Sequence, residues 1–390
     1  MKKLTIGIFK DSFFPMMDGV CMVVDNYARI LSKFANVIVF VPDYKGNNFD
    51  DSKLEYKVVR CKSKKIFFLD YSLPTPYLDK KFMNELNSYK LDIVHIHSPF
   101  SLGKVGLKYA KKHGIPVVAT MHSQFKQDFK RAVKSDYFSS KLTNVLIRLF
   151  NQCDECWAVN SEVAKIYYED YGYKTLPRIM NNATDMKPIL FKEKSKKIID
   201  EKHNIRDEKV FLFVGRINKL KNIFFIVDSL RILKNKHPNF KFKMLFVGNG
   251  QDLEELKKYI LKKDLKNEID LCGKVTDRAL LAAYYLRADL FLFPSLYDAS
   301  SIVQIEAASQ KTPTLFLEDS ATSATITNNV NGFIVENNEE EYADKIIDIM
   351  SNEKLYKQVC KNVYKDIYVN WDKRVKEAYD LYLDIINNKK

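Results

Sequence analysis

Short apolar runs alternate with amphipathic helical patterns along most of the 390-residue chain. The runs are rich in Val, Ile and Phe and are bounded by residues such as Gly, Pro and Asn, which is typical of buried strands. Because continuous apolar strands that alternate with helices indicate parallel sheets covered on both faces, the chain predicts a doubly wound α/β fold. In the first half, strands are expected at residues 4–9, 37–42, 56–61, 92–97, 116–122 and 156–160.

The length of the chain predicts two domains, since 390 residues are too many for one ordinary hydrophobic core. A Lys-rich polar stretch at 187–197 has the composition of a linker, and we place the boundary near residue 190. Beyond it the alternation of strands and helices resumes with a strand at 210–214. Helices at 339–351 and 353–369 and a last one from Trp371 finish the chain.

The stretch from Ala288 to Phe316 is the most informative part of the second half. A short apolar strand at 290–293 is closed by breakers and followed by a helical pattern and another strand. Ser301 and Gln304 have the spacing of a capping box, in which the serine oxygen accepts a backbone N–H and the glutamine reaches back to the cap. The free N–H groups and the positive end of the helix dipole predict an anion site at 300–303.

Asp298 and Glu306 flank the predicted helix N-terminus. Arg216 and Lys221 follow another strand, which ends at Gly215. Fixed cations beyond a strand end are suited to a reaction in which negative charge grows on a leaving phosphate. In the alternative interpretation, Asp298 only caps the helix, Glu306 is solvated, and the two cations are ordinary surface residues.

Two histidines stand at predicted strand ends in the first half. His97 and His122 each close a strand, where ligands of doubly wound sheets bind, whereas His95 lies inside its strand and is expected in the core. Either terminal histidine can instead be a structural hydrogen-bonding group.

These motifs, in this order, resemble the retaining GT-B glycosyltransferases of family 4. Asp298 and Glu306 match the acid-x7-acid signature of that family, and Gly215, Arg216 and Lys221 match its G-R-x4-K element. The connection 182–185, the V-G-x-G turn at 247–250 and the F-x-G-x-V-like stretch at 271–275 also resemble family elements. The resemblance spans essentially the whole chain.

The chain departs from the family pattern at several positions. Asp298 stands where glutamate is usual, and residues 299–301 are Ala, Ser and Ser in place of a Gly-containing loop. Asn222 replaces a common Gly, and Asp18 stands where a second Gly often precedes the first helix. These changes concern the loops that hold the donor in the family.

The resemblance implies a GT-B fold with two Rossmann-like domains that face a central cleft. It implies an acceptor-side domain at 1–190, a nucleotide-sugar domain at 191–370, and a last helix at about 371–390 that packs back on the first domain. The implied catalytic residues are Arg216, Lys221, Asp298 and His122. The implied donor-binding residues are Asp18, Gly19, Gly215, Gly248, Gly273, Val275, Ala299, Ser300, Ser301, Ile302, Val303 and Glu306.

The implied reaction is transfer of a hexosyl group from a UDP- or GDP-linked sugar to a hydroxyl of a lipid or glycan, with retention. No D-x-D tripeptide occurs, so we expect no metal and no other cofactor, with the two cations and the helix N-terminus in their place. A nucleotide-sugar epimerase of the same fold and a non-catalytic partner subunit are the alternatives. The net charge of +14 favours anionic partners, but no nucleic-acid-binding motif is present.

The segment 124–149 interleaves aromatic residues with cations. Such a segment can lie on an anionic membrane surface, or its aromatics can be core residues with the cations in water. The start of the chain has no signal-peptide pattern and the cysteines are scattered, so we expect a cytoplasmic protein, peripheral on the inner face of the membrane if the first interpretation holds. The cations assigned to acceptor or membrane contact are Lys126, Lys130, Arg131 and Lys134.

Overall fold

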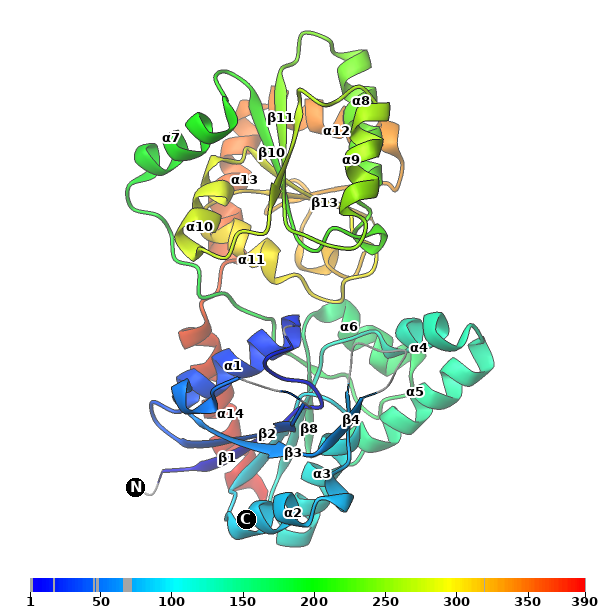
Figure 1. The fold of residues 1–390 in the computed structure, drawn as a ribbon, viewed down its shortest axis with the longest axis vertical. Helices are drawn as coiled ribbons and strands as arrows, with labels where there is room; N and C mark the ends of the chain where they lie inside the picture. The colour runs from blue at the N-terminus through cyan, green and yellow to red at the C-terminus, as the bar shows by residue number, and fades with distance from the viewer. Residues whose placement is uncertain are drawn as a thin grey trace. The chain divides into compact units, whose positions relative to one another are not determined.

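The computed structural model describes residues 3–16, 18–44, 46, 49–65, 72–318 and 320–389. The chain divides into two compact units (Figure 1). The first contains Met1–Asn182 together with Trp371–Lys390, and the second contains Ala183–Asn370. Each unit is a parallel sheet with helices on both faces, so the predicted α/β class, with two doubly wound sheets, is confirmed.

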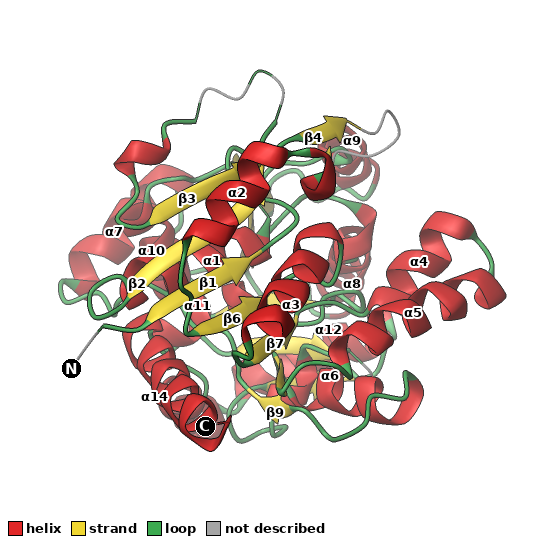
Figure 2. Cartoon of the chain, turned by 90° about the horizontal axis from the view of Figure 1, so that it is seen from below, coloured by secondary structure: helices red, strands yellow, loops and turns green. Residues whose placement is uncertain are grey.

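The sheet of the first unit has the strand order β3-β2-β1-β6-β7-β8-β9 within the described residues. Figure 2 shows β3, β2, β1, β6 and β7 side by side in this order. The strands are β1 (Thr5–Phe9), β2 (Asn36–Pro42), β3 (Lys57–Cys61), β6 (Ile93–Ile96), β7 (Val117–Met121), β8 (Glu155–Ala158) and β9 (Arg178–Ile179), and a separate antiparallel pair is β4 (Ser63–Lys65) and β5 (Ser72–Pro74).

The helices of the first unit are α1 (Gly19–Leu31), α2 (Lys80–Ser88), α3 (Ser101–His113), α4 (Phe125–Val133), α5 (Asp136–Phe150), α6 (Ser161–Lys165) and α14 (Trp371–Lys389). They include α14, which packs against α1. Tyr379 of α14 also contacts Phe34, just after the end of α1, with ring centroids 4.7 Å apart. No helix among the described residues has the length and apolarity needed to cross a membrane.

The sheet of the second unit has the strand order β12-β11-β10-β13-β14-β15. Its strands are β10 (Lys209–Val214), β11 (Phe242–Val247), β12 (Ile269–Gly273), β13 (Leu290–Phe293), β14 (Thr314–Leu317) and β15 (Phe333–Val335). Its helices are α7 (Lys192–His203), α8 (Ile223–Lys236), α9 (Leu253–Lys262), α10 (Arg278–Arg287), α11 (Ile302–Ser309), α12 (Glu339–Ser351) and α13 (Glu353–Asp366). The strands are fully apolar at their centres, for example Phe211, Leu212 and Phe213, because both faces are covered.

The strand order of each sheet reverses at one point. In the first unit β1 lies between β2 and β6, and in the second unit β10 lies between β11 and β13. The loops after two such neighbouring strands separate toward opposite faces, which opens a crevice at the carboxyl ends of the strands. Both crevices contain residues that the sequence assigns to function.

Candidate functional site

The crevice of the second unit is formed by the loops after β10 and β13, which are held together by polar contacts. The Asn222 side-chain amide donates to the carbonyl oxygen of Pro294 at 3.3 Å, and the Ser295 hydroxyl donates to the carbonyl oxygen of Leu220 at 3.4 Å. Asn222 stands at φ 57°, in the left-handed region where Gly is common and Asn is tolerated. These contacts place the predicted cations of one loop beside the predicted acid of the other.

Lys221 and Asp298 form an ion pair between these two loops. Their side chains are 19% and 18% exposed. The Lys221 ammonium contacts Oδ1 of Asp298, while Oδ2 is buried and has no hydrogen-bond partner among the described residues. Because a buried carboxylate oxygen normally accepts a hydrogen bond, Oδ2 is available to a donor from a ligand.

Arg216 is exposed at the edge of a cavity of about 620 Å³ that lies beyond the ends of β10, β11 and β12. The backbones of the β10 and β11 loops meet beneath it so closely that a Cβ on Gly248 would lie 1.8 Å from the carbonyl oxygen of Gly215. Gly248 also has φ 152°, so glycine is required there on both counts. The full lining is Val214, Gly215, Arg216, Val247, Gly248, Asn249, Gly250, Lys274 and Val275.

Gly215, Gly248 and Val275, which the sequence assigns to donor binding, thus share one cavity with Arg216. Gly273 lies at the end of β12, with φ 70°. Lys274 also lines the cavity, although the sequence assigns it no function. No sequence motif identifies a lysine between a strand end and a helix cap, so its place in the cavity lining is seen only in the structure.

The N-terminus of α11 is capped by Ser301, whose hydroxyl accepts the backbone N–H of Gln304 at 3.4 Å. Among the described residues no hydrogen bond joins the Ser301 backbone N–H to the Gln304 side chain, so the second half of the expected capping box is not found. The side-chain nitrogen of the buried Gln304 donates to the Thr325 hydroxyl at 2.8 Å. Ile302 and Val303 are half-buried, and Ala299 and Ser300 form the loop that leads into the cap.

Glu306 is buried in the second turn of α11, so the alternative of a solvated side chain is wrong. Its Oε1 contacts Arg278 Nη1 at 2.8 Å, and its Oε2 accepts the Tyr285 hydroxyl at 3.0 Å. Burial raises the pKa of Glu306, and the nearby Arg278 cation opposes that rise. Arg278 and Tyr285 belong to no motif, so the sequence gives no signal for either residue.

The crevice of the first unit contains a cluster of histidines. His97 Nδ1 and His122 Nε2 lie 2.9 Å apart, and His97 Nε2 has no partner among the described residues. His95 is in the core, as expected, between the Tyr382 hydroxyl at 2.6 Å and the Thr120 hydroxyl at 2.7 Å. The structure thus brings His97 and His122 together just beyond the ends of β6 and β7.

The loop after β1 contributes a buried lysine to this crevice. Lys10 is 2% exposed, and its ammonium contacts the Ser12 hydroxyl and, at 3.2 Å, Asp18. Asp18 also caps α1 by accepting the Cys21 backbone N–H at 2.7 Å. Gly19, expected to allow close approach of a ligand, begins α1 without positive φ, and an added Cβ there would meet nothing within 4 Å. The protein alone therefore imposes no requirement for glycine at this position.

The three histidines are held neutral. Burial lowers the pKa of His122 to about 3, with a further lowering from the Lys10 cation. Burial also lowers the pKa of His95 and His97 well below the ordinary value, and the neighbouring histidines add to this effect. At neutral pH these rings can donate and accept hydrogen bonds but carry no charge.

We expect the free energy of unfolding to fall as the pH decreases below about 6.5. Below that pH the histidines bind protons in the unfolded chain but stay neutral in the folded protein. Each folded-state pKa is depressed, so each histidine stabilises the fold above its unfolded pKa and loses that contribution as the pH falls, by up to about 1.4 kcal/mol per pH unit. Urea denaturation between pH 7 and 5 measures the slope, which should be shallower in His122→Gln. Equal slopes would mean that His122 is protonated in the folded protein.

The segment 124–149 forms α4 and most of α5, and its aromatic residues divide into two groups. Phe125 and Phe129 are half-buried, with ring centroids 6.1 Å apart. Tyr137 and Phe138 are 63% and 59% exposed. The aromatics of α4 are thus used for packing, whereas α5 presents its aromatics to solvent, and contact with a membrane stays a prediction.

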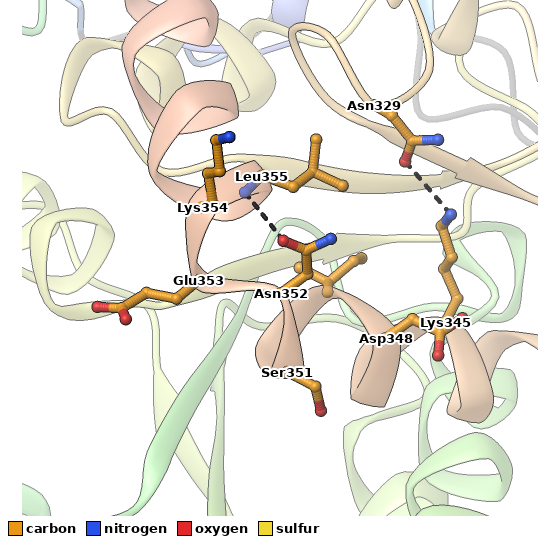
Figure 3. Close-up of a pocket in the computed structure, with 9 residues that line it drawn as sticks. Asn329, Lys345, Asp348, Ser351, Asn352, Glu353, Lys354 and Leu355 are labelled. Atoms are coloured by element: carbon orange, nitrogen blue, oxygen red, sulfur yellow. Dashed lines mark hydrogen bonds between the residues drawn. The ribbon is translucent and has the colours of Figure 1, made fainter.

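Another cavity, of about 690 Å³, lies where α12 ends and α13 begins (Figure 3). Lys345 Nζ donates there to Asn329 at 3.3 Å, and the Leu355 backbone N–H donates to Asn352 at 3.1 Å. The lining contains no residue that the sequence assigns to function, and its main polar contacts are a helix cap and a surface bond. We assign this cavity no role.

Two family models match the chain in succession. The model "Glycosyltransferase Family 4" matches residues 17–187, and the model "Glycosyl transferases group 1" matches residues 195–366. The alpha-monoglucosyldiacylglycerol synthase of Acholeplasma laidlawii is 29% identical to this chain over 99% of each sequence. Together the two models span nearly all of both units.

Solved structures share the fold. The sucrose-phosphate synthase of Thermosynechococcus elongatus superimposes with a TM-score of 0.81 at 18% identity, covering 99% of this chain and 100% of its own. The HepE protein of Anabaena in complex with UDP superimposes with a TM-score of 0.78 at 14% identity, covering 98% and 100%. The GT-B fold implied by the motifs is thus confirmed.

Proposed function

Because the chain belongs to glycosyltransferase family 4, whose members use nucleotide-sugar donors, we propose that it transfers a hexosyl group from a UDP-sugar to a hydroxyl of a membrane lipid, with retention. The observation that carries the donor half is the arrangement at the carboxyl end of β10. There Arg216 borders a cavity of about 620 Å³, and Lys221 of the same loop is paired with Asp298 of the loop after β13.

In this proposal the second unit binds the donor diphosphate beside Arg216 and Lys221. Cleavage of the bond to the sugar leaves negative charge on the departing phosphate, and fixed cations stabilise that charge more in the transition state than in the ground state. Arg216 supplies a planar fork of donors and Lys221 a point charge, two of whose three donors remain after its contact with Asp298. The free N–H groups at the start of α11 add a partial positive charge.

Asp298 takes the sugar side of this site. Its Oδ2, buried and unpartnered, is suited to accept a hydrogen bond from a donor hydroxyl. Glu306, held deeper on α11, is suited to the ribose hydroxyls. In the first unit, the neutral His122 can form a hydrogen bond with a hydroxyl without carrying charge. We favour uridine as the nucleoside because the structure of the fold relative HepE is described as a complex with UDP.

The acceptor half rests on α5 and on the Acholeplasma relative. Exposed apolar side chains lie at the end of α4 and along α5, namely Val133, Tyr137, Phe138, Leu142 and Val145. Cations surround them, and Lys141 lies over the Tyr137 ring with 4.4 Å from Nζ to the centroid. Aromatic and apolar groups flanked by cations are suited to the interface of an anionic membrane. The relative is named for synthesis of a glucosyldiacylglycerol, so we favour diacylglycerol as the lipid.

We expect the protein to bind vesicles that contain anionic lipid, and to bind them less tightly as salt increases. Replacing Lys126, Lys130, Arg131 and Lys134 together with Gln should weaken sedimentation with such vesicles by about 10-fold or more, since each cation near the surface contributes on the order of 1 kcal/mol. Ion pairs of Lys130 with Asp136 and of Arg131 with Asp128 reduce the effect below a simple sum.

A matched control replaces cations of the second unit, Lys257, Lys258 and Lys262 on α9, by Gln. This change lowers the net charge comparably but leaves α4 and α5 intact. Tyr137→Ser with Phe138→Ser should reduce binding at high salt, where the apolar contribution remains. If the protein ignores anionic vesicles at low salt and glycosylates a soluble saccharide, the lipid acceptor is wrong.

The reaction itself is tested by mass spectrometry of products after incubation of a nucleotide-sugar panel with diacylglycerol vesicles and with soluble glycans. A hexosyl lipid formed from one UDP-sugar is the expected product. An epimerised nucleotide sugar formed from donor alone would establish the epimerase instead. A glycosylated glycan without glycolipid would keep the transferase and reject the lipid.

A further inference from the structure

We propose that Arg278 is a positioning residue for nucleotide binding, because its guanidinium holds the buried Glu306 carboxylate oriented and ionised while also binding Asp185. This inference rests on the proposed function, since it takes Glu306 as the group that binds the ribose. Arg278, the first residue of α10, would thus affect nucleotide binding indirectly, through Glu306 of α11.

The contacts form a chain across three segments of the second unit. Arg278 Nη1 lies 2.8 Å from Glu306 Oε1, and Arg278 Nη2 contacts Asp185 Oδ1. Tyr285, two turns further along α10, donates its hydroxyl to Glu306 Oε2 at 3.0 Å. Both carboxylate oxygens of Glu306 are thus fixed from α10. Asp185 belongs to the segment by which the chain enters this unit.

The position of Arg278 on its own helix is unfavourable. It is the first residue of α10, next to the Asp277 cap, where the positive end of the helix dipole disfavours a cation. The two carboxylates offset that cost. The side chain of Arg278 is 45% exposed, so its charged group reaches from solvent to a Glu306 side chain that is only 7% exposed.

Hydrogen-bonding capacity explains why the charge of Glu306 matters. An ionised carboxylate offers about four acceptor positions, and Arg278 and Tyr285 take one on each oxygen. The remaining positions can accept the two hydroxyls of a ribose. A protonated Glu306 would carry a donor on one oxygen and lose that capacity.

The groups against Glu306 determine its protonation. Burial raises its pKa, Arg278 lowers it by charge and by hydrogen bonding, Tyr285 lowers it by hydrogen bonding, and the Asp185 charge raises it. Burial also raises the pKa of Tyr285, which therefore remains a donor across the neutral range. Removal of Arg278 takes away the largest opposing influence, so the pKa of Glu306 must rise further.

The test is the affinity for UDP, measured by calorimetry between pH 6 and 8. The wild-type protein should bind UDP with little pH dependence from Glu306. In Arg278→Gln the affinity should be lower and should increase with pH, by up to about tenfold per pH unit below the new pKa. Arg278→Lys retains the charge and should restore most of the wild-type pH profile. In Asp185→Asn, loss of the opposing charge should lower the pKa of Glu306 and keep its carboxylate ionised to lower pH.

The control variant is Arg287→Gln, at the other end of α10. Arg287 is also ion-paired, with Asp200 and Asp289, but does not contact Glu306. It should bind UDP with the wild-type pH profile. A second probe, 2′-deoxy-UDP, should bind more weakly than UDP to the wild-type protein, and this discrimination should shrink in Arg278→Gln at pH 6.

The outcomes distinguish failure of the proposed function from failure of the positioning role of Arg278. If the wild-type protein binds no nucleotide, the proposed function fails. If it binds UDP and Arg278→Gln binds equally tightly with the same pH profile, the positioning role is wrong. A uniform loss of affinity at every pH in Arg278→Gln would also overturn it, in favour of direct contact between Arg278 and the nucleotide.

Discussion

Arg216→Ala and Lys221→Ala should each lower kcat by about 10²- to 10³-fold, or roughly 3 to 4 kcal/mol of transition-state stabilisation. Both residues follow β10, at the point where the loops after β10 and β13 are joined. The reaction develops charge on a leaving phosphate there, and a preorganised cation costs no reorganisation when that charge appears. Steady-state turnover with the identified donor measures the effect.

The two cations should also weaken binding of free UDP, because part of the negative charge is already present in it. The double variant should lose less than the product of the two single losses, since both cations act on the same oxygens. Lys219→Ala is the matched control, because Lys219 lies in the same turn but forms an exposed ion pair with Glu255. If both single variants retain near-normal turnover, the diphosphate is bound elsewhere.

Asp298→Asn should lower kcat strongly, by about 10²-fold on the scale of one lost active-site contact. The amide preserves the size of the side chain but removes the charge that faces Lys221 and replaces one acceptor oxygen by a donor. Thermal stability should change little, because the pair is partly exposed and lies in a loop. Turnover and the melting temperature, measured on the same samples, separate the two effects.

Asp298→Glu tests the length of the side chain, whereas Asp298→Asn tests its charge. It keeps the charge and adds one methylene, so we expect activity equal to or above that of the wild-type protein if the loop 294–301 has room for it. A protein with equal activity in the Asp, Asn and Glu forms would show that Asp298 contributes only to the structure of its loop.

The fold was predictable because its signals are local. The strand expected at 210–214 appears as Lys209–Val214, and the one at 290–293 appears with the same bounds. Buried parallel strands are short and apolar throughout, and each is followed by breakers, so neighbouring residues alone identify them. The order of strands and helices then restricts the topology.

The contacts within the site were much less predictable, because they join residues that are distant in the sequence. Lys221 and Asp298 are 77 residues apart, and His97 and His122 are 25 apart. The hydrophobic periodicity of the sequence does not predict contacts between such distant residues. Gln304 shows the same limit, since its spacing from Ser301 favoured a capping box, whereas the bond found for its side chain goes to Thr325, 21 residues away. Arg278 was missed because a lone arginine at a helix start usually lies in water.

The chain passes twice between the units, so the second unit is one continuous segment whereas the first unit is made of two segments. The second unit enters at Ala183 and leaves at Asn370, and its ends lie side by side, since the Thr184 backbone N–H donates to the Val369 carbonyl at 3.0 Å. The second unit is thus a domain inserted into the first, and we call them the cassette and the host. Because its ends are adjacent, the cassette can be deleted from the host or inserted into another protein with little change in the surrounding chain.

The host unit, by contrast, is completed only by α14, which follows the whole second unit in the sequence. Tyr382 of α14 hydrogen-bonds His95 and stacks on Trp157 with ring centroids 5.5 Å apart, deep in the core of the first unit. During translation the cassette can therefore close before its host does. A truncation that removes α14 would therefore damage the first unit, although that unit begins at the other end of this sequence.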